Sequence, residues 1–258
     1  MPRVHPAAVV DPGAKLADDV VVGAFSWIGP NVELGTGVVV ANHVSISGAT
    51  RVGARTHVHP FAALGGDPQD KKYAGEPTRL EVGADCRIHE GVTIHRGTPQ
   101  SGGITVVGDD VMLMNGAHVA HDCQIGAHAV VASFCGLAGH VEVGEYAVLG
   151  AYTGVHQNAR IGESAMTAAN AKLSKDAPSF SMVAGDHARG VGLNSIGLRR
   201  RGLSDAAIAD LKHAFHLLFA SKLRFETAVA RVRDEVGATP EVARLLAFLA
   251  SSQRGVAR

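Results

Sequence analysis

The chain has 258 residues, with 24 Lys plus Arg and 24 Asp plus Glu, so its formal net charge is zero. The lack of a basic excess argues against nucleic-acid binding, and no run approaches the roughly 20 apolar residues of a membrane span. The first residues lack the apolar run of a secretory signal, and the three cysteines form no CxxC pair. We therefore expect a cytoplasmic protein with no membrane span and no nucleic-acid partner.

Aliphatic residues recur at every sixth position along most of the chain. These runs cover positions 10–64, 82–94 and 107–161, and the fourth residue after each aliphatic position is small or β-branched. A period of six indicates short strands with a corner after each, and three such hexads form one coil of about eighteen residues. Stacked coils pair through parallel ladders. Since known hexapeptide folds wind left-handed, the predicted fold class is a mainly β, left-handed parallel β-helix of hexapeptide repeats.

Glycine and cysteine have regular places in this repeat. Glycine often follows the aliphatic position directly, as at Gly126 and Gly144, and we expect it to suit the tight corners. Cys86, Cys123 and Cys135 each occupy the small inward position, where a thiol acts as a small hydrophobe. A buried thiol away from positive charge has little thiolate. The cysteines are therefore predicted to be structural, and neither a nucleophile nor a metal ligand.

Two interruptions break the period of six. Residues 65–80 carry polar, Gly and Pro residues where a strand is expected, and residues 97–106 shift the phase, because Val107 follows Ile94 by thirteen positions instead of twelve. Ordered loops that leave a rigid scaffold often carry function. We expect both segments to be loops close to a functional site.

The period of six fades after Leu173, and helical periodicity replaces it. Ser204 is a good N-cap for a first long helix, a second helix is predicted to end at Gly237, and a third begins at Thr239 and Pro240. We therefore divide the chain into a hexapeptide-repeat β-helix domain over residues 1–187 and a small C-terminal α-helical domain over residues 188–258.

Several of the fourteen histidines are predicted to meet in one patch. Residues eighteen apart lie one above another in such a coil, which groups His121, Gly139, His140, His156 and Gln157. A neutral imidazole can take a proton at working pH, so His121 is a candidate general base.

The neighbouring Asp122 could orient the His121 ring. Consecutive side chains of a strand point to opposite sides, so this contact requires a corner at that point. Two alternatives stay open on the residues alone. His118-x-x-His121 with a further histidine could hold zinc, as in zinc carbonic anhydrases of this fold, and the β-helix could be an interaction scaffold without catalysis.

Six segments together resemble the UDP-N-acetylglucosamine acyltransferase family, and the resemblance covers essentially the whole chain. They are KYAGEPTRL (72–80), VTIHRGT (92–98), AHVAHDCQIG (117–126), LAGHVEVG (137–144), GVHQ (154–157) and GLRRRG (197–202). The resemblance implies transfer of an R-3-hydroxyacyl group from acyl carrier protein to the 3-hydroxyl of UDP-N-acetylglucosamine, the first step of lipid A biosynthesis. It also implies a homotrimer with active sites between subunits. No metal and no cofactor are implied, since 4′-phosphopantetheine is carried by the acyl carrier protein.

The resemblance also implies residue roles. His121 would be the general base, Asp122 would assist it, and the backbone N–H of Gly139 would bind the thioester oxyanion. Other positions would contact substrate, namely Gln69, Asp70, Lys72, His95, His118, His140, His156 and Gln157, with Asn194, Arg200 and Arg201 on phosphate groups. Ala169 falls at the acyl-chain ruler position, where members that take long chains have Gly, which predicts a shorter acyl chain.

Two positions depart from the family pattern. Ile196 stands where the family often has Glu near the nucleotide, and Asn158 stands where an aromatic residue is usual. An amide-forming acyltransferase acting on a 3-amino or 2-amino UDP-sugar would use the same base and oxyanion donor. The sequence leaves that alternative open.

Overall fold

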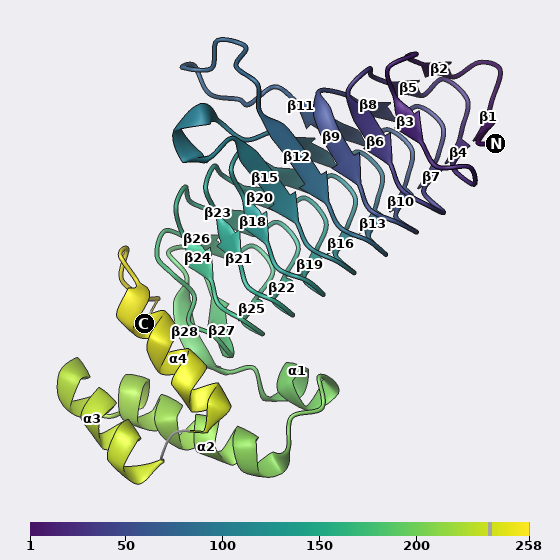
Figure 1. Ribbon diagram of the computed structural model, residues 1–258. Coiled ribbons are helices and arrows are strands. Elements are labelled where there is room, and N and C mark those ends of the chain that lie inside the picture. Colours follow the sequence, from purple (N-terminus) through teal and green to yellow (C-terminus); the bar gives the residue numbers. More distant parts are fainter. Residues whose placement is uncertain (237–238, 258) are drawn as a thin grey trace.

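The computed structural model describes residues 1–236 and 239–257, which form a three-sided β-helical prism closed at one end by helices (Figure 1). Each side of the prism is one sheet of very short strands. Sheet A has eleven strands: β1 (Arg3–Val4), β4 (Val21–Val22), β7 (Val39–Val40), β10 (His57–Val58), β13 (Arg87–Ile88), β16 (Met112–Leu113), β19 (Val130–Val131), β22 (Val148–Leu149), β25 (Met166–Thr167), β27 (Ser181–Ala184) and β28 (Arg189–Leu193).

The other two sides complete each coil. Sheet B has nine strands: β2 (Val9–Val10), β5 (Trp27–Ile28), β8 (Ser45–Ile46), β11 (Ala63–Gly66), β14 (Thr93–His95), β17 (His118–Val119), β20 (Gly136–Leu137), β23 (Gly154–Val155) and β26 (Lys172–Leu173). Sheet C has eight: β3 (Lys15–Leu16), β6 (Val32–Leu34), β9 (Ala49–Val52), β12 (Arg79–Val82), β15 (Ile104–Val107), β18 (Gln124–Ile125), β21 (Glu142–Val143) and β24 (Arg160–Ile161).

The period of six is confirmed by the strand register and the core. Val21 pairs in parallel with Val39, and Gly136 with Gly154, so residues eighteen apart lie side by side in regular coils. The aliphatic positions form one continuous core, in which Ile28 and Leu137 have no exposed surface. All three cysteines are buried in that core and form no disulfide, as their positions predicted.

Glycine follows the aliphatic position for a different reason from the one expected. Gly126 and Gly144 have no positive φ. A Cβ at Gly126 would lie 2.6 Å from the backbone nitrogen of Glu145 in the next coil, and one at Gly144 would lie 2.5 Å from that of Glu163. Close stacking of coils therefore requires these glycines, whereas non-glycine residues such as Asp122 adopt the left-handed corner conformation.

The two interruptions leave the same edge of the prism as neighbouring loops (Figure 1). Residues 67–78 connect β11 to β12, and the second loop contains the short 3-10 helix η1 (Pro99–Ser101). The Arg79 N–H donates to the Gly103 carbonyl at 2.8 Å, which joins the bases of the loops. Both interruptions contain a loop, as expected, but residues 65–66 belong to β11, residues 79–80 to β12 and residues 104–106 to β15.

The C-terminal helices pack around a second core at the end of the prism. They are α1 (Ser195–Arg200), α2 (Asp205–Phe215) with a π-helical continuation η2 (His216–Ala220), α3 (Phe225–Glu235) and α4 (Pro240–Ser251). Ser204 accepts a hydrogen bond from the Ala207 N–H at 3.2 Å, which confirms the predicted N-cap. The predicted helix end at Gly237 lies outside the described residues. No described helix has the length and hydropathy needed to cross a membrane.

The chain between the prism and the helices is a strand. β28 pairs antiparallel with β27 and thus extends sheet A beyond residue 187, and the first helix begins at Ser195. Near the C-terminus the chain returns to the prism, where the Ala257 N–H donates to the Asp176 carbonyl at 2.8 Å. The helical region is therefore tied to the last coils at both of its ends.

Candidate active site

A cavity of about 700 Å³ lies on the outer face of sheet B, over β17, β20, β23 and β26. The eighteen-residue spacing brings equivalent positions of successive coils into this one surface. Six residues predicted for the site line it, namely Gln69, His118, His121, Gly139, His156 and Gln157. Four of the five residues predicted to form one patch therefore line one cavity within this chain, and the fifth, His140, does not.

His121 and Asp122 form a close pair at the corner after β17. His121 Nδ1 lies 2.7 Å from Asp122 Oδ2, and the two residues are only 8% and 5% exposed. An ionised carboxylate can only accept a hydrogen bond, so Nδ1 carries the proton and the Nε2 lone pair stays free. The pair has the geometry of a general base held by its orienting carboxylate.

The carboxylate of Asp122 is itself held by the second loop. The Thr98 N–H donates to Oδ1 at 2.7 Å and the Thr98 hydroxyl donates to Oδ2 at 2.6 Å. The Asp122 N–H donates to Thr105 Oγ1 at 2.8 Å, which fixes the backbone of the corner. Because each carboxylate oxygen has a donor, the buried charge of Asp122 is stabilised and its direction toward His121 is set.

Gly139 lies against the free edge of the His121 ring. A Cβ at Gly139 would be 2.7 Å from His121 Nε2 and 2.5 Å from Cε1, so only glycine leaves room for the imidazole. Within the described part of the chain the Gly139 N–H donates to no acceptor. That N–H is therefore available to an oxyanion that forms beside His121.

Two further predicted histidines surround the pair. His118 Nδ1 lies 2.7 Å from Thr93 Oγ1, and burial, together with the nearby His95, lowers the pKa of His118, which favours its neutral form. His140 does not line the cavity, but its ring packs edge-on against His121 with 5.1 Å between centroids. Its Nε2 lies 3.7 Å from Asp122 Oδ2.

The first loop brings only part of its predicted residues to the cavity. Gln69 lines it, whereas Asp70 and Lys72 lie beside it on the loop and contact each other, the Lys72 N–H donating to Asp70 Oδ1 at 3.0 Å. His95 also stands next to the cavity, with Nδ1 2.5 Å from the Asp67 carbonyl. Direct substrate contacts of these three residues stay predictions.

This chain alone does not bring Asn194, Arg200, Arg201 or Ala169 to His121. Asn194 is buried, its amide donates to the Ser164 carbonyl at 3.0 Å, and its side-chain oxygen caps α1. The expected phosphate contact of Asn194 therefore competes with a structural role in this chain.

The remaining three lie on the surface or pair within the chain. Arg201 forms an ion pair with Glu163 and stands over the Tyr146 ring at 4.0 Å from the centroid. Arg200 is exposed, and Ala169 is exposed in the turn between β25 and β26. Ile196, which departs from the family pattern, is 64% exposed.

Three residues that the sequence did not single out line the far end of the cavity. Lys172 Nζ lies 2.8 Å from Asp186 Oδ2, and His187 lies beside them. Lys172 comes eighteen residues after Gly154 and pairs with it in register, so the coil spacing could have found it. Asp186 and His187 lie beyond the last regular hexad, and the period gave no signal for them.

Only one group of residues at this site, among those described, has the spacing to hold a zinc ion. Among the described residues, His121, Asp122 and His140 each offer one ligand atom within 4.8 Å of the others, and His118 is not in that group. His118, which the zinc alternative paired with His121, belongs to neither such group and lies 2.7 Å from Thr93 Oγ1 through its Nδ1. The other such group, His59, His89 and Glu90, lies outside the cavity.

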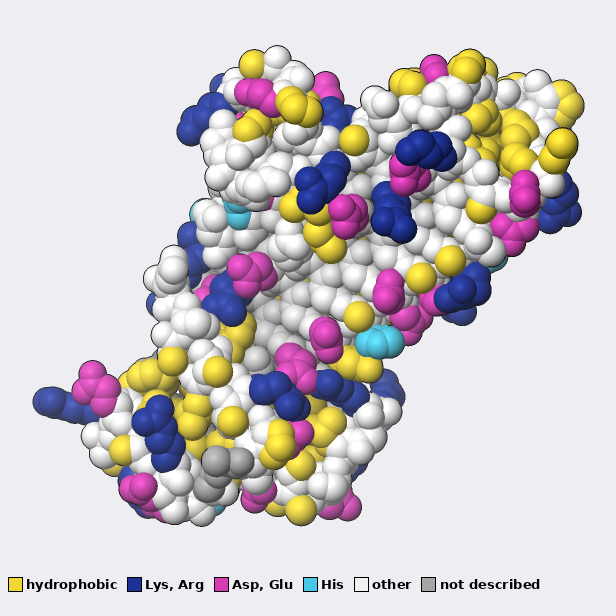
Figure 2. All heavy atoms as spheres, viewed as in Figure 1, with side chains coloured by type: hydrophobic (Ala, Val, Ile, Leu, Met, Phe, Trp, Pro, Cys, Tyr) yellow, Lys and Arg dark blue, Asp and Glu magenta, His cyan; other side chains and the backbone are white. Residues whose placement is uncertain are grey.

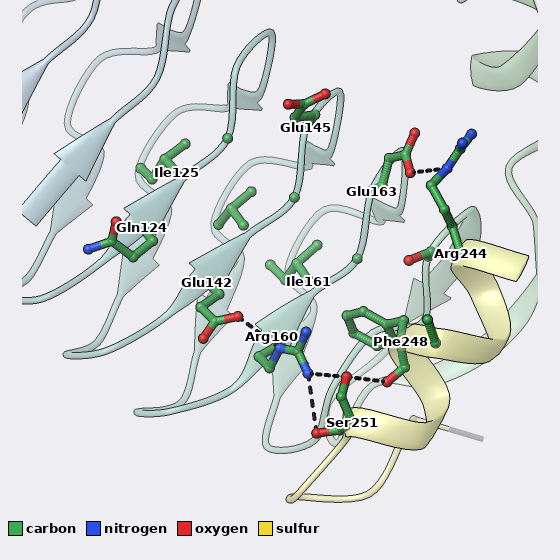
Figure 3. Close-up of a pocket in the computed structure, with 16 residues that line it drawn as sticks. Gln124, Ile125, Glu142, Glu145, Arg160, Ile161, Glu163, Arg244, Phe248 and Ser251 are labelled. Atoms are coloured by element: carbon green, nitrogen blue, oxygen red, sulfur yellow. Dashed lines mark hydrogen bonds and ion pairs between the residues drawn. The ribbon is translucent and has the colours of Figure 1, made fainter. Parts of the chain in front are cut away.

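A second groove of about 710 Å³ lies between sheet C and α4 (Figure 3). Four of its charged side chains form two ion pairs, Arg160 with Glu142 at 2.9 Å and Arg244 with Glu163 at 2.8 Å. Basic and acidic side chains alternate over this face of the molecule (Figure 2). No histidine lines the groove, so the described residues there offer no base comparable to His121.

Models of known families match two parts of the chain. The bacterial transferase hexapeptide model matches residues 104–139, and the model described as UDP-N-acetylglucosamine O-acyltransferase, domain 2, matches residues 176–257. The first covers the corner that carries His121 and Asp122, and the second covers the helical region.

Whole-chain relatives agree with these matches. The chain is 44% identical over 258 residues to the acyl-[acyl-carrier-protein]–UDP-N-acetylglucosamine O-acyltransferase of Thermodesulfovibrio yellowstonii, with 100% of both chains covered. It is 47% identical over 257 residues to the protein of the same name from Syntrophobacter fumaroxidans, covering 99% of this chain and 100% of the relative.

Solved structures extend the match to three dimensions. LpxA from Acinetobacter baumannii superimposes with a TM-score of 0.95 at 37% identity, covering 99% of each chain. LpxA from Bacteroides fragilis, a UDP-N-acetylglucosamine acyltransferase, gives a TM-score of 0.96 at 34% identity over 98% of this chain and 99% of that one.

Fold and site together define a hexapeptide-repeat acyltransferase. The predicted fold class, a left-handed parallel β-helix followed by a small helical region, is confirmed. The chain belongs to the UDP-N-acetylglucosamine O-acyltransferase family, as its motifs predicted.

Proposed function

We propose that this acyltransferase moves an R-3-hydroxyacyl group from acyl carrier protein to the 3-hydroxyl of UDP-N-acetylglucosamine, the first step of lipid A biosynthesis. The buried His121–Asp122 pair beside Gly139 is the observation that carries the proposal, because an imidazole held by a carboxylate lies next to a backbone glycine in one cavity, as a base and an oxyanion donor would have to. The names of the full-length relatives support the same donor and acceptor.

The reaction begins with proton removal. His121 Nε2 takes the proton of the sugar hydroxyl while Asp122 stabilises the imidazolium that forms. The sugar oxygen attacks the thioester carbonyl carbon, and the resulting oxyanion accepts a hydrogen bond from the Gly139 N–H. The tetrahedral intermediate then expels the phosphopantetheine sulfur, which takes the proton from His121. General-base catalysis contributes about 10²–10⁴-fold, and one oxyanion donor about 10²–10³-fold.

This chemistry uses no metal and no cofactor bound by the enzyme itself. The thioester already activates the acyl group, and its 4′-phosphopantetheine belongs to the acyl carrier protein. Unchanged turnover after dialysis against a chelator is the expected result. A loss that zinc restores would favour a metal held by His121, Asp122 and His140.

The proposed assembly is a homotrimer in which a neighbouring subunit supplies Arg200, Arg201 and Ala169 to the cavity. The edge between sheets A and B carries stacked aromatic side chains that are more than half exposed in one chain, namely Phe25 (65%), Phe61 (64%), Phe134 (51%) and Tyr152 (57%). An exposed apolar stripe of this kind is typical of a subunit interface. Light scattering of the purified protein tests the trimer, and a monomer would contradict it.

The substrates fit a cytoplasmic enzyme. Acyl carrier protein is acidic, so exposed basic residues such as Arg199 and Arg200 can steer it despite a net charge of zero. The three free cysteines agree with a reducing compartment.

The deciding experiment incubates the purified protein with UDP-N-acetylglucosamine and a series of 3-hydroxyacyl carrier proteins, and identifies products by mass. We expect an O-acylated UDP-sugar from the natural enzyme and none from His121→Ala. His128→Ala is the matched control, because His128 Nδ1 also contacts a carboxylate, Asp110 at 2.9 Å, but lies outside the cavity. Acylation of a 3-amino or 2-amino UDP-sugar in its place would overturn the proposed acceptor.

A further inference from the structure

The first loop is fastened to the prism by one buried arginine. We infer that Arg96 is a positioning residue that holds residues 67–78 against the cavity, so that Gln69, Asp70 and Lys72 can meet the sugar nucleotide. This inference rests on the proposed function for the identity of the ligand. The attachment of the loop by Arg96 can be tested even if the proposed function is wrong.

The Arg96 guanidinium contacts three separate points of the loop and its base. One nitrogen donates to the Gly65 carbonyl at 2.5 Å, and another donates both to the Asp67 carboxylate and to the Tyr73 hydroxyl, the latter at 3.0 Å. Arg96 is only 9% exposed. A single side chain thus ties together positions 65, 67 and 73.

The surrounding backbone is shaped to admit this side chain. Gly48 has φ +59°, and a Cβ there would lie 2.0 Å from an Arg96 guanidinium nitrogen. Gly65, whose carbonyl accepts from Arg96, has φ +75°, and a Cβ there would lie 2.0 Å from Thr50 Oγ1. Both positions require glycine for conformation and for space. The channel for Arg96 is therefore built by residues on two different coils.

The loop holds its own shape beyond these contacts. The Tyr73 hydroxyl donates to the Glu76 carbonyl at 2.8 Å, and the Tyr73 N–H donates to the Asp70 carbonyl at 3.0 Å. Gln69, Asp70 and Lys72 therefore belong to a turn whose position depends on where Tyr73 and Asp67 are fixed. Arg96 fixes both.

The same strand end connects the loop to His118 in the cavity wall. His95 precedes Arg96 and lies 2.5 Å from the Asp67 carbonyl, so consecutive residues hold the carbonyl and the carboxylate of one loop residue. The His95 ring also packs edge-on against His118, with 5.4 Å between centroids. The fastened loop thus forms one continuous contact network with the cavity wall.

Arginine suits this position better than lysine. Its planar guanidinium reaches three acceptors in fixed directions, whereas an ammonium is a compact point charge. Arg96→Lys should therefore keep the ion pair with Asp67 and lose part of the fastening, and Arg96→Met should lose all of it. The two variants form a graded series.

The kinetic test compares these variants with the natural enzyme. For Arg96→Met we expect the KM for UDP-N-acetylglucosamine to rise roughly 10-fold or more, with the KM for the acyl donor unchanged and kcat nearly unchanged. The KM of Arg96→Lys for UDP-N-acetylglucosamine should lie between the values of the natural enzyme and of Arg96→Met. Arg79→Met is the matched control, because Arg79 stands at the same loop base but, among the described residues, its side chain pairs with the partly exposed Glu81 at 3.0 Å and with no residue of the loop.

A second readout follows the loop itself. Lys71 and Lys72 are exposed on it, so trypsin should cut after them faster in Arg96→Met, and the sugar nucleotide should protect them less. If the natural protein transfers no acyl group, the proposed function is wrong. The cleavage assay then still tests whether Arg96 holds the loop against the prism. A folded Arg96→Met protein with unchanged cleavage and unchanged KM, or with a loss in kcat alone, would overturn the inference.

A variant that removes one contact keeps the test decisive if Arg96→Met does not fold. Tyr73→Phe deletes only the hydroxyl that joins Arg96 to the Glu76 carbonyl. It should raise the same KM and the same cleavage rate by a smaller factor. If Tyr73→Phe had the same KM and the same cleavage rate as the natural protein, the inference would be contradicted.

Discussion

His121 and Asp122 are consecutive in the chain, yet their side chains meet, with 2.7 Å between Nδ1 and Oδ2. In an extended strand the two would point to opposite faces. Asp122 has φ +61°, the left-handed conformation that Asp tolerates better than most residues. The corner after β17 therefore brings two neighbours in sequence into the contact that the proposed base and its orienting carboxylate require.

Asp122→Asn tests this arrangement. Asn can present an amide N–H to the imidazole instead of an acceptor, which favours the wrong tautomer of His121 and leaves the imidazolium without a countercharge. We expect kcat to fall roughly 100-fold or more with little change in the KM for the sugar nucleotide. The double variant with His121→Ala should be no worse than His121→Ala alone, and additive losses would show that the two residues act separately.

Thr98 should influence the rate through Asp122. In Thr98→Val the hydroxyl that donates to Oδ2 at 2.6 Å is lost, while the N–H that donates to Oδ1 remains. A hydrogen bond to a charged group is worth about 1.5–3 kcal/mol, so we expect kcat to fall roughly 10-fold. Thr98→Ser should restore it, and a Thr98→Val enzyme with natural kcat and pH profile would exclude this positioning role.

The repeat made most of the fold and the centre of the site predictable. A period of six gave the coil, and the coil spacing placed His121, Gly139, His156 and Gln157 on one surface. The contact of Thr98 with Asp122 could not be read in this way, because it spans 24 residues across a loop that shifts the phase.

The sequence also could not predict which partner a side chain contacts when two are possible. Asn194 could have met a phosphate or capped a helix, and only packing against Ser164 and Gly197 decided its place in this chain. Lys172 and Asp186 meet across the end of the regular coils, where no period relates them.

The floor of the cavity offers a test of acyl-chain selection. Gly136 and Gly154 pair in register on sheet B, and a Cβ at either would meet no atom within 4 Å. We expect Gly154→Leu to fill this open floor and to lower kcat/KM for the longest acyl donors at least roughly 10-fold more than for short ones. Measuring kcat/KM for a series of 3-hydroxyacyl carrier proteins of different chain length gives the ratio between long and short donors.

Ala63→Leu is the control for Gly154→Leu. It adds the same side chain to the outer face of sheet B, at an exposed position outside the cavity. An equal response of all donor lengths in Gly154→Leu would show that the acyl chain does not lie on the glycine floor.

The buried thiol of Cys123 should make stability depend on alkaline pH. Burial raises the pKa of Cys123 to about 12, whereas an unfolded cysteine ionises near 8.5. Between these values the folded state binds more protons than the unfolded state, so the free energy of unfolding falls as pH rises, by up to about 1.4 kcal/mol per pH unit for one group.

Cys123→Ala should remove this contribution without a large cost, because other coils place alanine in the same inward position, as at Ala129 and Ala147. Urea unfolding between pH 8 and pH 11 should therefore give a shallower decline for Cys123→Ala than for the natural protein. Burial also raises the pKa values of Cys86 and Cys135. Part of the fall in unfolding free energy with pH should therefore remain in both the natural protein and Cys123→Ala. Equal slopes would mean that the Cys123 thiol ionises as easily in the fold as in the unfolded chain, and the inward position of this residue would then be wrong.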